Sequence, residues 1–271
     1  MKGWTEDDIP WHRFDAAKAD PELLRVVKAA AVVEHNGGDY ETYLHKVFAD
    51  DADFCAAVSL WAQEEIRHGR ALARWAALAD PAFDFDRCFA RFRDGYRLPL
   101  DARRSVRGSR AGELVARCVV ESGTSSFYSS LAAAAEEPVL KEICRLIAAD
   151  EFRHYKLFYD QLNRYLAHDR LGLARRIWVA LRRVLESEDD ELAFAYYCGN
   201  DLPGPYRRRD CARAYARRAY RTYRYGYLQR GLAMVLKAAG LSPHGRIGDW
   251  LGRLAWGYMR LRRRRLERAP A

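Results

Sequence analysis

Two short segments of this chain place a glutamate three residues before a histidine, with an arginine between them. One is the run EEIRH that ends at His68, and the other is the run DEFRH that ends at His154. On a helix, residues at positions i and i+3 lie on one face, about 4.5 Å apart along the axis. Glu65 with His68 can therefore bind one metal ion, and Glu151 with His154 can bind a second, since carboxylates and imidazoles are ligands of divalent transition metals.

Two further glutamates complete a repeated pattern. Glu34 precedes Glu65 by 31 residues and Glu121 precedes Glu151 by 30, so a helix with one central glutamate is followed twice by a helix that carries ExxH. Glu34 and Glu121 can complete or bridge the two metal positions. Two divalent ions would balance four carboxylates, whereas four buried carboxylates alone would need strongly raised pKa values.

The alternative is that these residues are ordinary polar side chains on solvated helix faces, which is the better interpretation of either ExxH pair alone. The full set of six favours a buried metal site, because apolar residues stand beside the glutamates and histidines in the sequence: Val32, Val33, Leu60, Trp61, Val119, Val120, Ile147 and Phe152.

The elements that must position these residues are helices. Apolar residues recur at helical spacing in four segments, and no segment alternates with the period of two that a strand needs. The predicted helices are residues 21–49, with a distortion at Gly37 and Gly38, residues 51–80, residues 110–134 and residues 138–167, and residues 81–108 are predicted as a long connection. We therefore predict an all-α protein in which residues 21–168 form a ferritin-like four-helix bundle.

The predicted bundle is preceded by an N-terminal segment, residues 1–20, and followed by a basic helical C-terminal extension, residues 169–271. Helices are expected in the extension at about 170–187, 190–199, 209–239 and 246–268. From residue 170 onward, 23 Lys and Arg stand against 9 Asp and Glu, whereas the preceding part has 23 against 28. A surface with such an excess of basic residues attracts polyanions or acidic partners.

The compartment follows from what the sequence lacks. Six cysteines are spread along the chain without a CxxC pair, and no apolar run reaches the length that spans a bilayer. Both features predict a cytoplasmic protein.

The two motifs resemble those of the ferritin-like di-iron carboxylate superfamily, and within it those of the soluble acyl-carrier-protein desaturases. WAQEEIRHG at 61–69 and ADEFRH at 149–154 are similar to the two ExxH segments of that family. The resemblance implies two iron ions, with manganese as the alternative, and dioxygen as co-substrate. It further implies that Thr124, three residues after Glu121, lies beside the oxygen-binding face and helps to position or protonate bound dioxygen, and that Asp150 orients His68.

These features together predict a dioxygen-dependent non-haem di-iron oxidase. It would hydroxylate or desaturate an unactivated C–H bond of a lipid or acyl substrate, presented free, as an acyl thioester or on acyl carrier protein, with electrons from a ferredoxin-like donor. Three alternatives stay open: a tRNA-base hydroxylase, a ferritin-like protein of iron oxidation or peroxide scavenging, and a metal-free interaction module.

Two basic segments bear on the partners. Residues 207–231 interleave Arg with Tyr, which suits nucleic acid but suits a cover over the bundle better. Residues 246–268 form an amphipathic helix with Trp250 and Leu254 on one side and a final LRRRRLER. That helix predicts peripheral membrane contact or docking of an acidic protein, with a packed terminal helix as the plain alternative. The sequence is also compatible with a homodimer.

Overall fold

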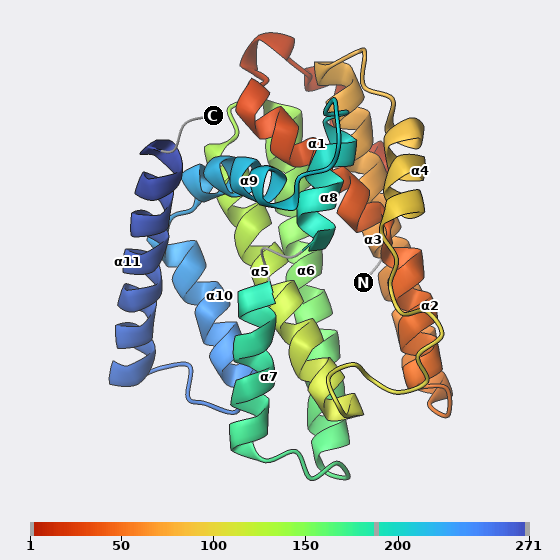
Figure 1. Cartoon of the computed structure of the whole chain (residues 1–271), viewed down its shortest axis with the longest axis vertical. Helices are drawn as coiled ribbons and strands as arrows, with labels where there is room; N and C mark the ends of the chain where they lie inside the picture. The colour runs from red at the N-terminus through yellow and green to blue at the C-terminus, as the bar shows by residue number, and fades with distance from the viewer. Residues whose placement is uncertain (1–2, 187–189, 269–271) are drawn as a thin grey trace.

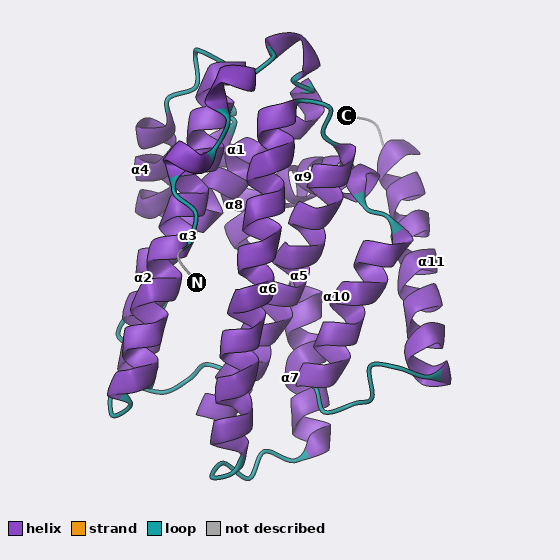
Figure 2. Ribbon diagram, turned by 180° about the vertical axis from the view of Figure 1, so that it is seen from behind, coloured by secondary structure: helices purple, strands orange, loops and turns teal. Residues whose placement is uncertain are grey.

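The computed structural model describes residues 3–186 and 190–268, apart from the side chain of Ile247, and every regular element in these ranges is helical. The prediction of an all-α protein is confirmed. Figure 1 shows the arrangement of the helices and Figure 2 the opposite side. After three short 3-10 turns within Glu6–Lys18, the helices are α1 (Pro21–His35), α2 (Gly37–Val47), α3 (Ala52–Ala79), α4 (Phe85–Gly95), α5 (Arg110–Ala134), α6 (Pro138–Leu166), α7 (Leu173–Leu185), α8 (Asp190–Gly199), α9 (Arg208–Thr222), α10 (Tyr225–Ala238) and α11 (Arg246–Arg268).

The long helices begin at side chains that cap them. Asp20, Asp51, Ser109 and Glu137 each accept a hydrogen bond from a backbone N–H in the first turn of α1, α3, α5 and α6, respectively. Such caps stabilise a helix by about 1 kcal/mol each. These four starts lie within one or two residues of those predicted from the sequence.

The predicted first helix is two helices, α1 and α2, which meet at Asn36. The break lies directly before Gly37 and Gly38, where a distortion was expected. A Cβ at Gly37 would lie 2.8 Å from Cβ of Glu65, so the absence of a side chain there allows close approach to α3.

Two predictions about the connections are wrong. Residues 81–108 are not a plain connection, because they contain α4, whose Phe92 is fully buried and packs in the cluster around α1 and α8. The predicted helix at 209–239 is interrupted at Tyr223 and Arg224, which separate α9 from α10.

The core is formed by α1, α3, α5 and α6, and the other helices pack around them. Helices α5 and α6 pack along one another, α3 packs against both α1 and α6, and the remaining helices cover the outside. In particular, α8 and α9 lie on α1, while α7 and α10 lie on α5. The segment after residue 169 therefore covers the two helices that carry Glu34 and Glu121.

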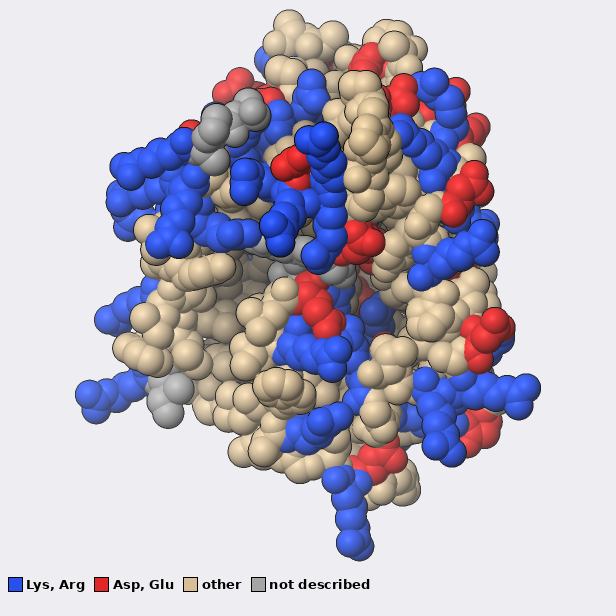
Figure 3. All heavy atoms as spheres, viewed as in Figure 1, with Lys and Arg blue, Asp and Glu red and all other residues tan. Residues whose placement is uncertain are grey.

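Charge and apolar exposure are uneven on the surface. Figure 3 shows Lys and Arg gathered over α9 and the adjacent end of α11. Trp250 and Tyr258 on α11 are 59% and 64% exposed, although α11 packs against α9 and α10 through other residues. Among the described residues no helix combines the length and the apolar character needed to cross a bilayer.

Gly69 supplies a test of how closely α1 must approach α3. A Cβ at this position would lie 2.6 Å from the backbone nitrogen of His35, directly after Glu34. We expect Gly69→Ala to lower the free energy of unfolding by about 1–3 kcal/mol, because α1 must move. Gly38→Ala, which meets no atom within 4 Å, should be neutral or stabilise by about 0.5–1 kcal/mol.

Denaturant unfolding of the metal-free protein measures both changes. Equal effects of the two substitutions would contradict the tight contact between α1 and α3.

Candidate metal centre

Four helices bring the six predicted ligands together. Glu34 comes from α1, Glu121 from α5, and the two ExxH pairs from α3 and α6. Their side-chain ligand atoms form two groups, and within each group all the atoms lie within 4.8 Å of one another. The first group is Glu34, Glu65, His68 and Glu151, and the second is Glu65, Glu121, Glu151 and His154.

The two groups share Glu65 and Glu151. Each of these glutamates can therefore contact two ions, whereas Glu34 and Glu121 each belong to one group. The sequence left open whether Glu34 and Glu121 complete or bridge the metal positions. If two ions bind, Glu65 and Glu151 are the glutamates that would hold both of them.

The cluster has buried polar atoms that suit a metal. One carboxylate oxygen each of Glu65, Glu121 and Glu151, and Nδ1 of His154, are buried and make no hydrogen bond of good geometry, although His154 Nδ1 lies 3.0 Å from Glu65 Oε1. A buried polar atom without a partner costs about 1–3 kcal/mol, and a bound ion would satisfy all four. The donor set of carboxylates and imidazoles, in two groups of four, therefore fits a pair of divalent ions.

The pKa values of the clustered residues also favour a bound metal. Burial, reinforced by repulsion from Glu151, raises the pKa of Glu65 and of Glu121 well above the usual range. Burial alone lowers the pKa of His68, but its contacts with Asp150 and Glu151 outweigh burial and raise that pKa well above its usual value. Without metal the cluster holds protons, so metal binding must release them and weakens as the pH falls.

Both histidines are held from outside by a carboxylate on a different helix. His68 Nε2 lies 3.0 Å from Asp150 Oδ2, and His154 Nε2 lies 2.8 Å from Glu64 Oε2. Each Nδ1 then faces the ligand carboxylates. The sequence predicted the contact of Asp150 with His68 but missed Glu64, although an acidic residue directly before each ligand glutamate was the signal.

The arginine inside each motif links these outer carboxylates. Arg67 lies 3.2 Å from Glu64 and 3.4 Å from Asp150, and Arg153 lies 3.2 Å from Glu64 and also binds Asp150. Burial raises the pKa of both carboxyls, but the histidine and arginine contacts outweigh it and hold both pKa values below the usual range. Both groups therefore stay ionised as acceptors for the histidines.

A residue of the N-terminal segment completes this outer layer. Trp4 Nε1 donates to Asp150 Oδ2 at 2.8 Å, and the Trp4 ring stacks on His68 with ring centroids 5.8 Å apart. The Arg67 guanidinium lies 4.9 Å from the same ring. Sequence reasoning missed Trp4, because the segment before Asp20 has no periodicity that would place it.

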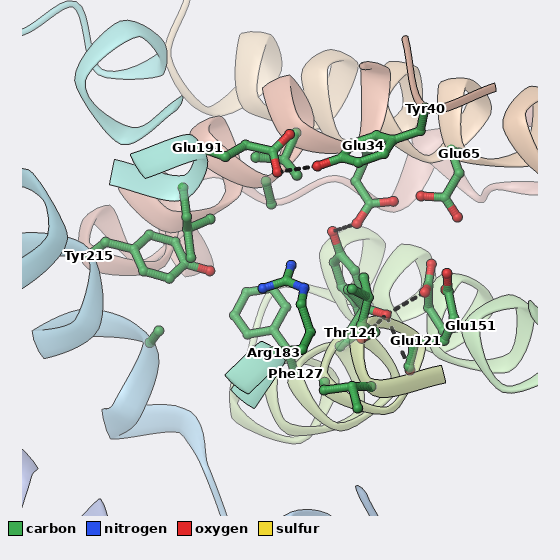
Figure 4. Close-up of a pocket in the computed structure, with 18 of the residues that line it drawn as sticks. Glu34, Tyr40, Glu65, Glu121, Thr124, Phe127, Glu151, Arg183, Glu191 and Tyr215 are labelled. Atoms are coloured by element: carbon green, nitrogen blue, oxygen red, sulfur yellow. Dashed lines mark hydrogen bonds between the residues drawn. The ribbon is translucent and has the colours of Figure 1, made fainter. Parts of the chain in front are cut away.

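Two hydroxyl groups contact the ligand carboxylates directly. The Thr124 hydroxyl donates to Glu151, and its oxygen lies 3.2 Å from the backbone oxygen of Glu121 (Figure 4). The Tyr128 hydroxyl donates to Glu34 Oε1 at 2.6 Å. Thr124 therefore lies beside the cluster.

A cavity of about 260 Å³ opens from the carboxylate side of the cluster. All four glutamates and Thr124 line it, whereas neither histidine does (Figure 4). Much of the remaining lining is apolar or aromatic: Val33, Val120, Phe127, Ala193, Tyr215 and Ala216. Arg183 on α7 points into this space (Figure 4).

Two apolar residues do not surround the cluster as the sequence suggested. Leu60 is 65% exposed and Phe152 is 51% exposed, although Phe152 directly follows a ligand glutamate. A neighbour in sequence is rotated by about 100° around the helix and therefore faces a different direction.

No protein-family model matches this chain, and no curated protein matches it. The interpretation of the site therefore rests on its own geometry and chemistry.

The shared glutamates give a test of the two-ion arrangement. We expect Glu65→Ala and Glu151→Ala to abolish binding of both ions, because each removes a ligand from both groups. Glu34→Ala and Glu121→Ala should each leave about one ion per chain. Metal analysis after anaerobic loading and desalting measures this, with circular dichroism as the check on folding. Equal losses in all four variants would contradict the assignment of the bridges.

The outer carboxylates give a second test. Asp150→Asn should weaken one step of a stepwise cobalt(II) titration and Glu64→Gln the other, each by about 10- to 100-fold, because each supports one histidine. Glu142→Gln, on the same helix as Asp150 but paired outward with Arg145, is the control. If neither step responds to Asp150→Asn or Glu64→Gln, these carboxylates do not support the ligands.

Proposed function

We propose that α1, α3, α5 and α6 form a ferritin-like bundle that holds a di-iron carboxylate centre. The order of the helices supports this, since two pairs of long helices are joined by the long crossover 80–109, and each pair supplies one glutamate followed by one ExxH motif. Two further observations support it: the side-chain oxygen and nitrogen atoms form two groups that share two glutamates, and four of these buried atoms make no hydrogen bond.

The activity that we propose is dioxygen-dependent oxidation of a small lipid or acyl substrate at an unactivated C–H bond, as hydroxylation or desaturation. The observation that carries it is the cavity, because it places an apolar compartment directly against the four carboxylates and Thr124. A storage site needs no such compartment for an organic molecule. Electrons would come from a ferredoxin-like donor.

The roles of the residues follow from their contacts. A pair of iron ions bound there would supply dioxygen activation. Glu65 and Glu151 would hold both ions, while Tyr128 fixes Glu34 through its hydrogen bond. The Thr124 hydroxyl, now bonded to Glu151, lies in the cavity wall and can hold or deliver a proton at Oγ1.

The lining of the cavity favours an amphipathic substrate. Val120 and Phe127 exclude water beside the carboxylates, and an apolar chain fits against them. Arg183 can bind a polar or anionic end through its guanidinium, which carries several N–H donors. The space is close to the lower end of the 300–1,000 Å³ that small-molecule sites usually occupy, so the bound part of the substrate is short.

The Arg and Tyr segment gives less support to the tRNA alternative. Tyr215, Tyr220 and Tyr223, together with Ala216 and Ala219, line the cavity from α9 and the residues after it. Because these aromatic residues line the cavity, the structure supports the interpretation of this segment as a cover over the bundle more than a role in stacking on an external base.

Iron loading tests the proposal as a whole. Protein loaded anaerobically with iron(II) should bind two ions per chain and change its visible absorption on exposure to dioxygen. With a panel of short fatty acids, acyl thioesters and membrane lipids, mass spectrometry should find a product altered by one oxygen atom or by two hydrogen atoms. Rapid iron oxidation without any organic product would favour the iron-oxidation alternative.

Thr124 gives a sharper test. Thr124→Val should keep both ions but lower the rate of product formation by about 100-fold or more, because it removes the hydroxyl that serves proton transfer. Thr124→Ser keeps the hydroxyl and should retain most of the activity. A valine variant with unchanged turnover would show that Thr124 has only a structural role.

A further inference from the structure

Exposed apolar side chains are concentrated on two helices outside the metal centre. In the described ranges thirteen large apolar residues are exposed, and nine of them lie on α7 and α11. On α7 they are Leu173, Trp178, Leu181, Val184 and Leu185, and on α11 they are Trp250, Leu254, Tyr258 and Leu261. Single exposed apolar residues are ordinary on a protein surface, but clusters of them mark an interaction site.

The apolar residues form a stripe on each helix. Trp178, Leu181 and Leu185 are spaced by three and four residues. On α11, Trp250, Leu254 and Tyr258 are spaced by four residues, and Leu261 follows Tyr258 by three. Side chains with this spacing lie on one face of a helix. Both helices are therefore amphipathic, with the apolar stripe turned to solvent and not to the protein core.

The two helices lie on either side of α10, which packs against both. In Figure 1, α7 and α11 flank α10, and in Figure 3 the same face has uncharged side chains on both sides of a recess, with Lys and Arg around them. The two apolar stripes therefore lie on helices that both pack against α10. We name them, with the arginines beside them, the α7–α11 surface.

The charge of this surface decides which partner it can accept. Helix α7 has no acidic residue and four arginines, of which Arg183 faces the cavity and Arg176 donates to the backbone oxygen of Ala238. Helix α11 has eight arginines and two acidic residues. Both helices also carry exposed arginines, such as Arg182 on α7 and Arg260 on α11, each about 100° around the helix from the adjacent leucine of the stripe. A second copy of the chain would bring two strongly positive surfaces together, which like-charge repulsion opposes.

We propose that the α7–α11 surface docks on an anionic lipid bilayer. Leucine and tryptophan side chains would enter the boundary between headgroups and acyl chains, and the arginines beside them would bind anionic headgroups, as interfacial amphipathic helices do. Nucleic acid would use the arginines but would leave nine apolar side chains exposed to water. The proposal rests on surface residues alone and holds whether or not the metal centre is an oxidase.

Vesicle binding by the full-length chain tests the proposal. Flotation with phosphatidylcholine vesicles that contain phosphatidylglycerol should recover the protein with the lipid, and pure phosphatidylcholine should recover much less. Added salt should weaken binding, because headgroup attraction is screened. Tryptophan emission should shift to shorter wavelength on binding, because Trp178 and Trp250 leave water.

Leucine substitutions identify the surface. Leu181→Ser and Leu254→Ser should each weaken partitioning into anionic vesicles by about tenfold or more, and together by more than either alone. Leu60→Ser is the matched control, because Leu60 is 65% exposed on α3, outside this surface, and it should leave binding unchanged. Circular dichroism and metal content should stay the same in all the variants.

Three results would overturn the proposal. One is no binding to anionic vesicles at low salt, and another is equal weakening by Leu60→Ser. The third is a stable dimer in size-exclusion chromatography that Leu181→Ser and Leu254→Ser dissociate, without vesicle binding, because the surface would then be an interface between copies.

Discussion

The structure depends on the electrostatics of four carboxylates and two imidazoles that meet inside a helical core. Groups of like charge are buried together only if something balances them, and here protons do so in the metal-free protein. Two divalent ions would balance the same charge. This condition explains why the histidines are held from outside by ionised Asp150 and Glu64, and why Arg67 and Arg153 in turn hold those carboxylates. Each of the two motifs thus supplies one Glu and His pair to the cluster. Each also supplies the outer carboxylate that holds the histidine of the other motif.

The sequence was sufficient to predict the cluster of carboxylates and imidazoles but not its surroundings. The six clustered residues could be predicted because helical spacing turns a repeat in sequence into a common point in space. The sequence does not show which outer carboxylate holds which histidine. Glu64 directly precedes Glu65 on α3, but it contacts His154 on α6. Trp4 reaches Asp150 through tertiary packing alone. Helix α4 did carry a signal, because Phe85, Phe89 and Phe92 follow helical spacing, but the surrounding charges obscured it.

The C-terminal region, predicted as a separate extension, contributes to the compartment beside the centre. Helices α8 and α9 cover α1, and their residues form much of the cavity wall. The alternation of Arg with Tyr and Ala in α9 has a simple cause: several Tyr and Ala residues face the cavity, while many of the arginines remain on the surface. The composition of α9 therefore resembles that of a nucleic-acid-binding segment because this helix has one face toward the cavity and one face toward solvent.

Helix α7 links the cavity to the outer surface. Arg183 points into the cavity, whereas Trp178 and Leu181 are exposed on another face of the same helix. If the outer face rests on a bilayer, α7 becomes the wall between the lipid and the carboxylates. An acyl substrate could then reach the cavity along α7 without crossing water, and its polar end could remain with an arginine throughout. This arrangement gives a physical reason why a buried cluster of carboxylates and imidazoles and two exposed amphipathic helices would be combined in one chain.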